Sequence, residues 1–502
     1  MSSLALLLLL APVNAWADEP VTYTEHIAPI LWKHCAACHR PGEIAPFSLL
    51  SYKDAAKRAN FIASITADRT MPPWKPEPGH GDFSGARRLS NAEIDLLARW
   101  AKTGAAEGDP KHLPPAPKFT EGWQLGQPDL VLKMPESFKV PAGGADIYQC
   151  FVIPIPLDRD RTVSAVEFRP GNTRVVHHAL LFLDSTGAAR KKAEAEKGPG
   201  FRSFGGPGVT VTGMLGGWVP GQVPQHFPEG IGLSLKKGSD LVLQIHYHPS
   251  GKAETDQSQL GIYFNKKPAE KLIAPLVLRT RDIDIPPGEK RYQRTVTTPP
   301  IPVDVYAVGI SPHMHYLGRE MKAWAELPGG KTERLIWIKD WDFNWQGSYL
   351  FAKPVRLPKG TILKLEAYYD NSADNPFNPS NPPKRVRFGE ETTDEMCLCP
   401  VTVYTDRRED SAALMKWQGL GLGSDLETAG AMAAASIPTD KLVPPGGVPI
   451  PERYKAVLQQ FDVDGDGKLT VAEIDAMPVL VRNKVKAAIK QYRDKQADPP
   501  KK

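Results

Sequence analysis

Half of the histidines of this chain gather in three short apolar segments, and each segment has the composition of a β-strand. Because side chains at positions i and i+2 of a strand point to the same face, His313 and His315 can hold one metal ion between them. Adjacent residues point to opposite faces, so His177 and His178 can converge only at a kink or a strand end. A lone pair of histidines is as often a surface feature as a metal site, but three clusters together predict a metalloenzyme. Six of the twelve histidines fall in these segments: His177, His178, His246, His248, His313 and His315.

The overall composition indicates a multidomain protein that is rich in short strands. The chain has 502 residues, 41% of them apolar, with 49 prolines and 42 glycines that predict many turns and little long helix. Its formal net charge is only +5 and no long basic run occurs, so nothing in the sequence points to nucleic acid.

The first 17 residues have the pattern of a secretory signal. An apolar leucine run is followed by Ala15-Trp16-Ala17, which resembles a cleavage site, although the usual positive charges before the run are missing. The run is too short to span a bilayer, and no other stretch reaches the required length. We therefore expect an exported protein, periplasmic or extracellular, without stable membrane insertion.

Cys35, Cys38 and His39 form a C-x-x-C-H motif, which is the attachment motif of c-type haem. The two thiols would form thioethers with the porphyrin, and His39 would be the proximal ligand of the iron. A redox dithiol or half of a zinc site is the alternative.

The residues around this motif, about 18–110, resemble a small class I cytochrome c. Residues 25–34 read as an amphipathic helix, and residues 93–102 as a second helix that opens on a capping box from Ser90 to Glu93. In such cytochromes a Met in a Pro-flanked loop is the second axial ligand, and Met71 is the candidate here. His34 and His80 are rival ligands, and core filling is the alternative role of Met71.

Residues 462–473 match the EF-hand loop, with Asp at positions 1, 3 and 5, Gly at 6 and Glu at 12. Residues 451–461 and 471–492 read as the flanking helices. Only one such loop occurs, whereas EF-hands usually pair, so structural calcium is favoured over signalling; a solvated acidic turn is the alternative. The predicted calcium ligands are Asp462, Asp464, Asp466, Lys468 through its carbonyl, Thr470 and Glu473.

Five motifs between about residues 123 and 408 occur in a fixed order. Each is weak alone, but the ordered set resembles the copper type II, ascorbate-dependent monooxygenase family, which includes dopamine β-monooxygenase and peptidylglycine-hydroxylating branches. The resemblance implies two antiparallel, jelly-roll-like β-sandwich lobes that each hold one copper ion. The motifs are Asp146-Ile147-Tyr148-Gln149-Cys150, His177-His178 with Leu180-Leu181-Phe182 behind it, Gln244-Ile245-His246-Tyr247, His313-Met314-His315-Tyr316-Leu317-Gly318 and Asp394-Glu395-Met396-Cys397.

The resemblance also implies the ligands of the two coppers. The electron-transfer site corresponds to His177, His178 and His246. The site where O2 is activated corresponds to His313, His315 and Met396. The donor types fit copper independently, because imidazoles bind copper well and a thioether selects Cu(I). His248 is an alternative ligand or a polar neighbour of His246, and Met314 is expected to point into the core.

Three positions depart from the peptide-amidating branch of the family. Where that branch has an Arg two residues before the His-x-His pair, and an Asn and a Tyr after the Met, this chain has Ser311, Leu398 and Pro400. The contact that grips a peptide carboxylate is thereby lost, so we expect no amidation of glycine-extended peptides.

Cysteine is also scarcer than in the family, which is rich in disulfides. Only Cys150, Cys397 and Cys399 stand outside the haem motif. Three cysteines cannot all pair within one chain, and although the family leads us to expect a disulfide bond, its partners stay open.

The predicted domains are a signal peptide (1–17), a small all-α cytochrome c domain (18–110), a linker (111–122), an N-terminal copper β-sandwich lobe (123–280), a C-terminal copper β-sandwich lobe (281–418), a second linker (419–450) and a helical EF-hand (451–495). The predicted cofactors are two copper ions, one covalently bound haem c and one calcium ion. The predicted reaction is hydroxylation of a C–H bond in a small organic substrate by O2. Electrons from an external donor, ascorbate or a redox protein, would pass through the haem to the electron-transfer copper and then to the oxygen-binding copper. The alternatives are a non-hydroxylating copper and haem electron-transfer or copper-binding protein, and a β region that serves only as a binding module.

Overall fold

The computed structural model describes residues 20–414 except 121, 197, 204, 205, 390 and 408, and then 417, 438–450, 458–477, 482, 485, 486, 489 and 490. The predicted signal segment, 1–17, and most of the predicted helix 451–461 lie outside these residues. The chain divides into two compact units, Met1–Trp74 with Gly85–Gln127, and Lys75–Ser84 with Pro128–Lys502. In the described part of the chain, no helix combines the length and apolar character needed to cross a membrane.

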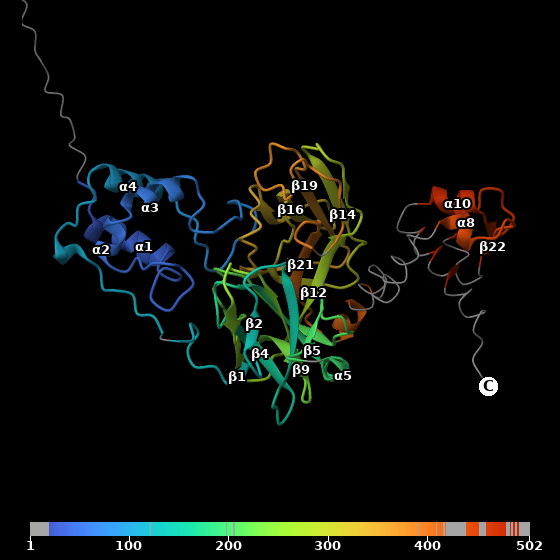
Figure 1. The fold of residues 1–502 in the computed structure, drawn as a ribbon, viewed down its shortest axis with the longest axis horizontal. Coiled ribbons are helices and arrows are strands. Elements are labelled where there is room, and N and C mark those ends of the chain that lie inside the picture. The colour runs from blue at the N-terminus through green and yellow to red at the C-terminus, as the bar shows by residue number, and fades with distance from the viewer. Residues whose placement is uncertain are drawn as a thin grey trace, which may run out of the picture. The chain divides into compact units, whose positions relative to one another are not determined.

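The first unit is a small helical body (Figure 1). A π-helical turn, Tyr23–Ile27, runs directly into α1. The helix predicted at 93–102 is confirmed and begins on the predicted capping box of Ser90 and Glu93. Its Trp100 is fully buried in the core of this unit. The helices are α1 (Ala28–His34), α2 (Tyr52–Ala56), α3 (Ala59–Ala67) and α4 (Asn91–Lys102), followed by a 3-10 turn, Pro110–His112.

The second unit is built mostly of antiparallel strands, as the sequence predicted. Its N-terminal lobe contains β1 (Leu130–Lys133), β2 (Phe138–Val140), β3 (Ile147–Pro154), β4 (Arg161–Arg169), β5 (Val176–Asp184), β6 (Phe201–Arg202), β7 (Gly213–Trp218), β8 (Ile231–Leu235), β9 (Asp240–Tyr247), β10 (Glu254–Asp256), β11 (Gln259–Phe264) and one helix, α5 (Ala188–Ala195). The C-terminal lobe contains β12 (Lys271–Thr280), β13 (Asp284–Ile285), β14 (Tyr292–Thr297), β15 (Val305–Ile310), β16 (Gly318–Glu326), β17 (Thr332–Ile338), β18 (Tyr349–Leu357), β19 (Ile362–Tyr369), β20 (Val386–Arg387) and β21 (Cys397–Tyr404).

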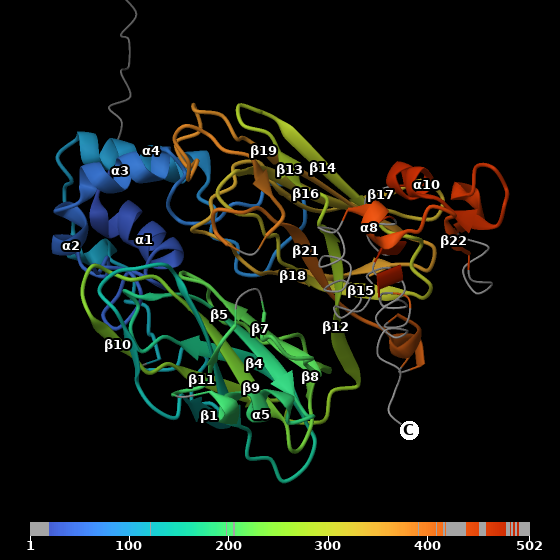
Figure 2. The ribbon, with the colours of Figure 1, turned by 45° about the vertical axis from the view of Figure 1, so that its right-hand side comes forward.

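Each lobe contains two main groups of strands, which is consistent with β-sandwich lobes. The N-terminal lobe has a five-stranded sheet, β6-β3-β9-β5-β7, and the C-terminal lobe a four-stranded sheet, β14-β19-β16-β17. An eight-stranded sheet, β1-β11-β4-β8-β12-β21-β15-β18, runs through both lobes. Its two halves are joined where β8 pairs in parallel with β12 for two residues. Figure 2 separates the green strands of the N-terminal lobe from the yellow and orange strands of the C-terminal lobe.

Residues 75–84, which we call the strap, belong to the second unit although they fall within the predicted cytochrome domain. The Glu77 N–H donates to the Trp337 carbonyl at 2.7 Å beside β17, and the Ser84 N–H donates to the Leu350 carbonyl at 2.8 Å on β18. Both strands are edges of their sheets. The Phe83 ring is buried and stacks on Phe351 at 5.1 Å between centroids. The strap therefore covers two sheet edges whose backbone groups would otherwise be exposed.

The described C-terminal residues form a small body of their own, with α8 (Thr439–Leu442), β22 (Val448–Pro449), a 3-10 turn (Gln459–Phe461), β23 (Lys468–Leu469) and α10 (Val471–Ala476). β22 pairs with β23, and Leu442 packs with Leu469 and Ile474. Residues 438–450, the described end of the predicted linker, thus pack against the apolar side of the acidic loop.

The cysteines outside the C-x-x-C-H motif are buried free thiols. Cys150 lies on β3, and Cys397 and Cys399 lie two residues apart on β21. The disulfide bond that the resemblance led us to expect is thus not formed among these residues.

Candidate metal centres

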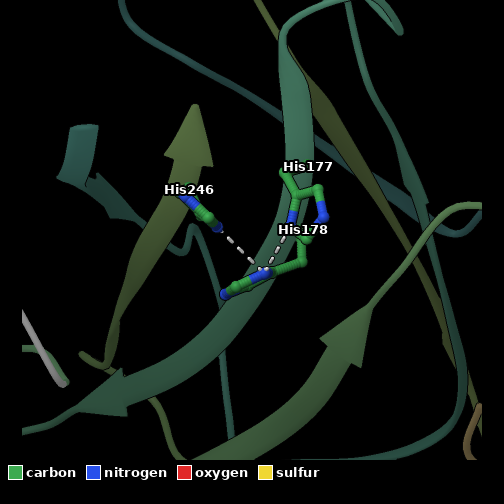
Figure 3. Close-up of side chains that lie close together, drawn as sticks. All are labelled: His177, His178 and His246. Carbon is green, nitrogen blue, oxygen red and sulfur yellow. Dashed lines mark hydrogen bonds between the residues drawn. The ribbon is translucent and has the colours of Figure 1, made fainter. Parts of the chain in front are cut away.

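Three histidines from two neighbouring strands converge in the N-terminal lobe (Figure 3). His177 and His178 lie on β5, and His246 lies opposite His178 on β9. The register shifts between Val176 and His178, so a β-bulge supplies the kink that the sequence required. The Nδ1 atom of His178 lies 3.2 Å from Nδ1 of His177 and 3.3 Å from Nδ1 of His246. Three ring nitrogens within 4.8 Å of one another form a cluster that can hold a metal ion.

Asp146 fixes the orientation of this cluster. It directly precedes β3, and because β3 pairs with β9 in antiparallel register, Asp146 lies beside the end of β9. The His246 Nε2–H donates to one carboxylate oxygen at 2.8 Å, and the His248 Nδ1–H donates to the other at 2.7 Å. A neutral His246 that donates through Nε2 has a lone pair on Nδ1, directed at His178. His248, with a largely exposed side chain, is therefore the polar neighbour of the cluster.

Two histidines of this cluster, His177 and His178, are neutral at ordinary pH. Burial lowers the pKa of His177 to about 4, and it lowers the pKa of His178 well below the usual value, with further lowering from the neighbouring His246. Burial by itself raises the pKa of Asp146, but the hydrogen bonds from His246 and His248 outweigh it and bring the pKa to about 2. Converging neutral imidazoles beside an ionised carboxylate are a favourable environment for a cation.

A second pair of histidines lies in the C-terminal lobe just beyond β15. His313 forms an isolated antiparallel bridge with Leu398, and His315 follows in the loop before β16, so neither lies on the regular strand that was predicted. Their rings nevertheless lie close together, with centroids 5.1 Å apart. Met314 between them is fully buried, as expected for a side chain that points into the core.

In both histidines of the second pair, the Nδ1 atom is engaged in a hydrogen bond. The His313 Nδ1–H donates to Oε1 of Gln346, and the His315 Nδ1–H donates to the carbonyl of Asp394 at 3.0 Å. Each neutral ring therefore has its lone pair on Nε2, where a metal ligand needs it. Burial lowers the pKa of both, that of His315 to about 3.

The carboxyl group of Glu395 holds the backbone around Met396 against this pair. It accepts hydrogen bonds from the N–H groups of His315 at 2.9 Å, Leu317 at 2.6 Å and Met396 at 3.2 Å. Complete burial raises the pKa of Glu395 to about 8. The predicted thioether ligand thus stands on a segment that is bonded to both histidine-bearing residues, since Leu398 also pairs with His313.

One aromatic ring, that of Phe343, contacts both histidine groups. It stacks on His177 at 5.5 Å between centroids with an interplanar angle of 19°, and it lies edge-on to His315 at 6.0 Å. Trp341 in the same loop donates its indole N–H to the His315 carbonyl at 3.2 Å. Sequence reasoning did not identify Phe343 or Gln346, and it assigned Glu395 no role within its motif, because each acts on the site through a tertiary contact.

The C-x-x-C-H motif of the first unit fits covalent haem attachment. The His39 Nδ1–H donates to the Phe47 carbonyl at 3.1 Å, which leaves Nε2 as the ligand atom. Burial raises the pKa of Cys35 to about 12, and a neutral thiol of this kind disfavours the redox-dithiol alternative. The rivals of Met71 are engaged elsewhere: the His34 ring pairs with Glu93 at 3.0 Å, and His80 packs on Trp337 in the second unit.

The acidic loop near the C-terminus has oxygen atoms directed inward. Carboxylate oxygens of Asp462, Asp464 and Glu473 lie within 4.8 Å of one another. Glu473 also accepts from the Val463 N–H at 2.6 Å and closes a capping box with Thr470 at the start of α10. β23 within this loop pairs with β22, in the place where a second EF-hand loop would usually pair.

The three positions that depart from the amidating branch lie together. The Ser311 N–H donates to the Pro400 carbonyl at 2.9 Å, and Leu398 pairs with His313. The Ser311 hydroxyl bonds to the Ser348 hydroxyl at 2.9 Å. The place that an Arg would occupy two residues before His313 is thus filled by a neutral, hydrogen-bonded side chain.

Comparison with known proteins supports the resemblance. Residues 273–415 match the family described as copper type II ascorbate-dependent monooxygenase, C-terminal domain. Over 277 residues the chain is 24% identical to the peptidylglycine alpha-amidating monooxygenase of Rattus norvegicus. The aligned region covers 53% of this chain and 26% of that protein. The chain thus spans about a quarter of the length of this relative.

Two viral capsid structures share a distant likeness. The major capsid protein P2 of bacteriophage PM2 has a TM-score of 0.24 at 10% identity, over 52% of this chain and 97% of that one. The infectious bursal disease virus VP2 subviral particle has a TM-score of 0.17 at 8% identity, over 57% of this chain and 74% of that one. Scores this low support no conclusion. The family and sequence matches do support one: residues 273–415 are similar to the C-terminal domain of the copper type II ascorbate-dependent monooxygenases.

Proposed function

We propose that the protein is an exported copper-dependent monooxygenase that hydroxylates a C–H bond of a small organic substrate with O2. The observation that carries this proposal is the pair of differently built histidine groups, one in each lobe, that both contact the ring of Phe343. In the overall reaction, R–H, O2, two electrons and two protons give R–OH and water. A storage protein has no need for two sites of different construction.

The donor sets of the two lobes fit copper ions with different roles. His177, His178 and His246 would hold the electron-transfer copper. His313, His315 and Met396 would hold the second copper, where the thioether favours Cu(I) and the small number of ligands leaves a position for O2. Copper supplies one-electron chemistry at both sites. The protein keeps the imidazoles neutral, orients them through Asp146 and Gln346, and shields them with Phe343.

We further propose that electrons from ascorbate or a redox protein enter through a haem on Cys35, Cys38 and His39, with Met71 as the second axial ligand. The hydrogen bond from His39 to the Phe47 carbonyl supports the proximal role of His39, because it leaves the other ring nitrogen free. Covalent continuity supports the relay as well, since the chain passes directly from Trp74 into the strap of the second unit.

One calcium ion in the acidic loop is proposed as a structural cofactor, held by Asp462, Asp464, Asp466, Lys468, Thr470 and Glu473. The convergence of three carboxylates supports it, and so does the pairing of β22 with β23, which ties the loop to a local core. Adding Ca²⁺ to protein stripped with a chelator should raise the melting temperature of the wild type but not that of Glu473→Gln. Equal curves with and without Ca²⁺ would contradict the proposal.

The substrate is proposed to be something other than a glycine-extended peptide. The neutral group formed by Ser311, Leu398 and Pro400 offers no cation for a peptide carboxylate. Turnover of such a peptide at an ordinary enzymatic rate would refute this part of the proposal.

The experiment that tests the function measures copper, iron and calcium in full-length protein from an exporting, haem-competent host, alongside O2 consumption with ascorbate. We expect about two coppers and one iron per chain, and weaker Cu(I) binding in Met396→Ala. Hydroxylated product should match the O2 consumed. Copper binding with no coupled product formation across a broad substrate screen would favour the electron-transfer alternative instead.

A further inference from the structure

The space around the Phe343 ring is too small for an organic substrate. Phe343 is 7% exposed, and its ring packs on His177, on His315 and, at 4.4 Å between centroids, on Tyr316. The hollow that borders this ring, with Trp341 as another wall, has room for about one water molecule. From this side, a molecule with a C–H bond to hydroxylate can therefore reach the histidines only if Phe343 moves.

Phe343 lies in a tight turn, residues 342–345, that can move as one piece. Asp342 Oδ1 accepts from the Asn344 N–H at 2.9 Å and from the Asn344 side-chain amide at 3.1 Å. The Trp345 N–H donates to the Asp342 carbonyl at 3.0 Å. These hydrogen bonds close the turn on itself, and none of them involves the histidine groups. Movement of the turn therefore breaks only the contacts that it makes with its surroundings.

The residues that flank this turn are fixed to the C-terminal lobe. On one side, Trp341 donates its indole N–H to the His315 carbonyl at 3.2 Å and its backbone N–H to the Arg319 carbonyl at 2.9 Å. On the other side, Gln346 accepts from His313. The turn is thus attached at two fixed ends, which is the arrangement of a lid.

One side chain of the strap holds the turn from outside. Lys75 Nζ lies 3.1 Å from Oδ2 of Asp340, which is largely exposed, and 4.0 Å from Oδ2 of Asp342. The Lys75 side chain is only 9% exposed and that of Asp342 19%, so this pair is less screened by solvent than an ordinary surface pair. An ammonium group at this place favours the position of the turn in which Phe343 lies against the histidines. Lys75 is also the first residue of the second unit, directly after Trp74.

We propose that residues 342–345 are a lid over the two proposed copper sites and that Lys75 is the positioning residue that keeps the lid shut. In the shut state the Phe343 ring excludes water between His177 and His315, and in the open state the organic substrate can enter. The inference rests on the proposed function, because it concerns access to the proposed sites. Its test needs neither copper nor turnover, so the two can fail separately.

The test measures how fast diethylpyrocarbonate modifies single histidines in full-length, copper-free protein, with peptide mass spectrometry as the readout. Lys75→Met should speed the modification of His177 and of His315 by the same factor, about 3- to 10-fold, because one opening exposes both rings. His248, which is 69% exposed, is the internal reference and should react at the same rate in every variant. Lys75→Arg keeps the charge and should stay within about twofold of the wild type.

The matched control is Lys271→Met. Lys271 forms an ion pair with the same nitrogen–oxygen distance, 3.1 Å to Asp406, but it lies on β12 and its partner lies outside the turn. This variant should modify both histidines at the wild-type rate. Equal rates in Lys75→Met and Lys271→Met would overturn the proposal, and so would faster modification of only one of the two histidines.

Removing the ring separates a latch from a residue that only stabilises the fold. Phe343→Ala should speed the modification of both histidines by itself, and adding Lys75→Met should then change the rates by less than about twofold. If Lys75 only stabilised the fold, its loss would act equally with and without the ring, and that result would refute the lid. The comparison with Lys271→Met decides the question even if Phe343→Ala does not fold. A latch found in a protein that consumes no O2 would refute the enzyme function and leave the lid standing.

Discussion

Replacing Asp146 by alanine tests how the N-terminal-lobe cluster is oriented. The carboxylate fixes His246 through a 2.8 Å hydrogen bond to Nε2, and this leaves Nδ1 to face His178. Without Asp146 the His246 ring can still stack on Tyr148, at 4.3 Å between centroids. The ring therefore stays near its place, but its proton is free to move to Nδ1, where it competes with a metal ion.

The magnitude follows from the kind of contact that is removed. Loss of a hydrogen-bond partner of a metal-binding His typically weakens metal affinity about 10- to 100-fold, which corresponds to about 1.4–2.7 kcal/mol. The loss should be confined to one copper, because the His313 and His315 rings are oriented by Gln346 and by the Asp394 carbonyl instead. Competition with a chelator of known copper affinity would resolve one weakened and one unchanged site.

His248→Ala is the matched control for this variant. It removes the other hydrogen bond to Asp146, from a side chain that is 69% exposed, and leaves the bond to His246 in place. We expect it to change copper affinity by less than about threefold. The reasoning is wrong if Asp146→Ala binds both coppers as the wild type does, or if it weakens the two sites equally.

Three further predictions concern other parts of the second unit. Gln346→Leu should weaken copper binding at the C-terminal-lobe site about 10-fold, because His313 loses the acceptor that fixes its tautomer; copper spectroscopy of the variant should show the N-terminal-lobe signal unchanged. Asp184→Ala should cost about 2–4 kcal/mol at pH 7 in urea unfolding, because the buried carboxylate accepts from the N–H groups of Thr186 and Ala189. Burial alone raises the pKa of Asp184, but these hydrogen bonds hold the pKa below its usual value. The stabilisation by Asp184 is therefore complete above the unfolded-state pKa of about 3.9 and is lost as the pH falls through the lower folded-state pKa. The difference in unfolding free energy between wild type and Asp184→Ala should disappear over that pH range. Gly81→Ala should lower the melting temperature by several degrees and expose the strap to proteolysis, because the φ of Gly81 is +83° and an added Cβ would lie 2.4 Å from the Leu335 carbonyl oxygen. Gly79→Ala is the control, because Gly79 has a similar φ of +76° with open space around it, and its melting temperature should fall less.

The convergence of the histidines could be predicted from the sequence because its signal is local. Two adjacent histidines, or two separated by one residue, are visible in a few consecutive letters, and three such clusters in one chain together predict metal sites. Even the bulge at His177 follows from the alternation of side chains along a strand. The EF-hand loop is equally self-contained, since its ligands lie within twelve consecutive residues.

The residues that orient those ligands could not be predicted in the same way. Asp146 reaches His246 only because β3 pairs with β9 in one register, across 100 residues of chain. Phe343 and Gln346 come from an irregular loop with no periodicity to read. The role of a residue such as Glu395 depends on which backbone groups face it, and this is decided when the strands assemble.

The strap changes how the proposed electron relay has to be tested. Deleting residues 18–110 would appear to remove only the cytochrome, but it would also strip Phe83 and the hydrogen bonds of residues 77–84 from β17 and β18. The loop that follows β17 carries Trp341 and Phe343, which contact His315, so a loss of turnover in that deletion would not distinguish a broken relay from a disturbed copper site. Replacing Cys35 and Cys38 by serine prevents covalent haem attachment and leaves the strap intact. If the relay exists, this variant should retain both coppers and turn over with ascorbate supplied directly, yet lose turnover with a protein donor. Unchanged turnover with both donors would mean that electrons reach the lobes without the haem.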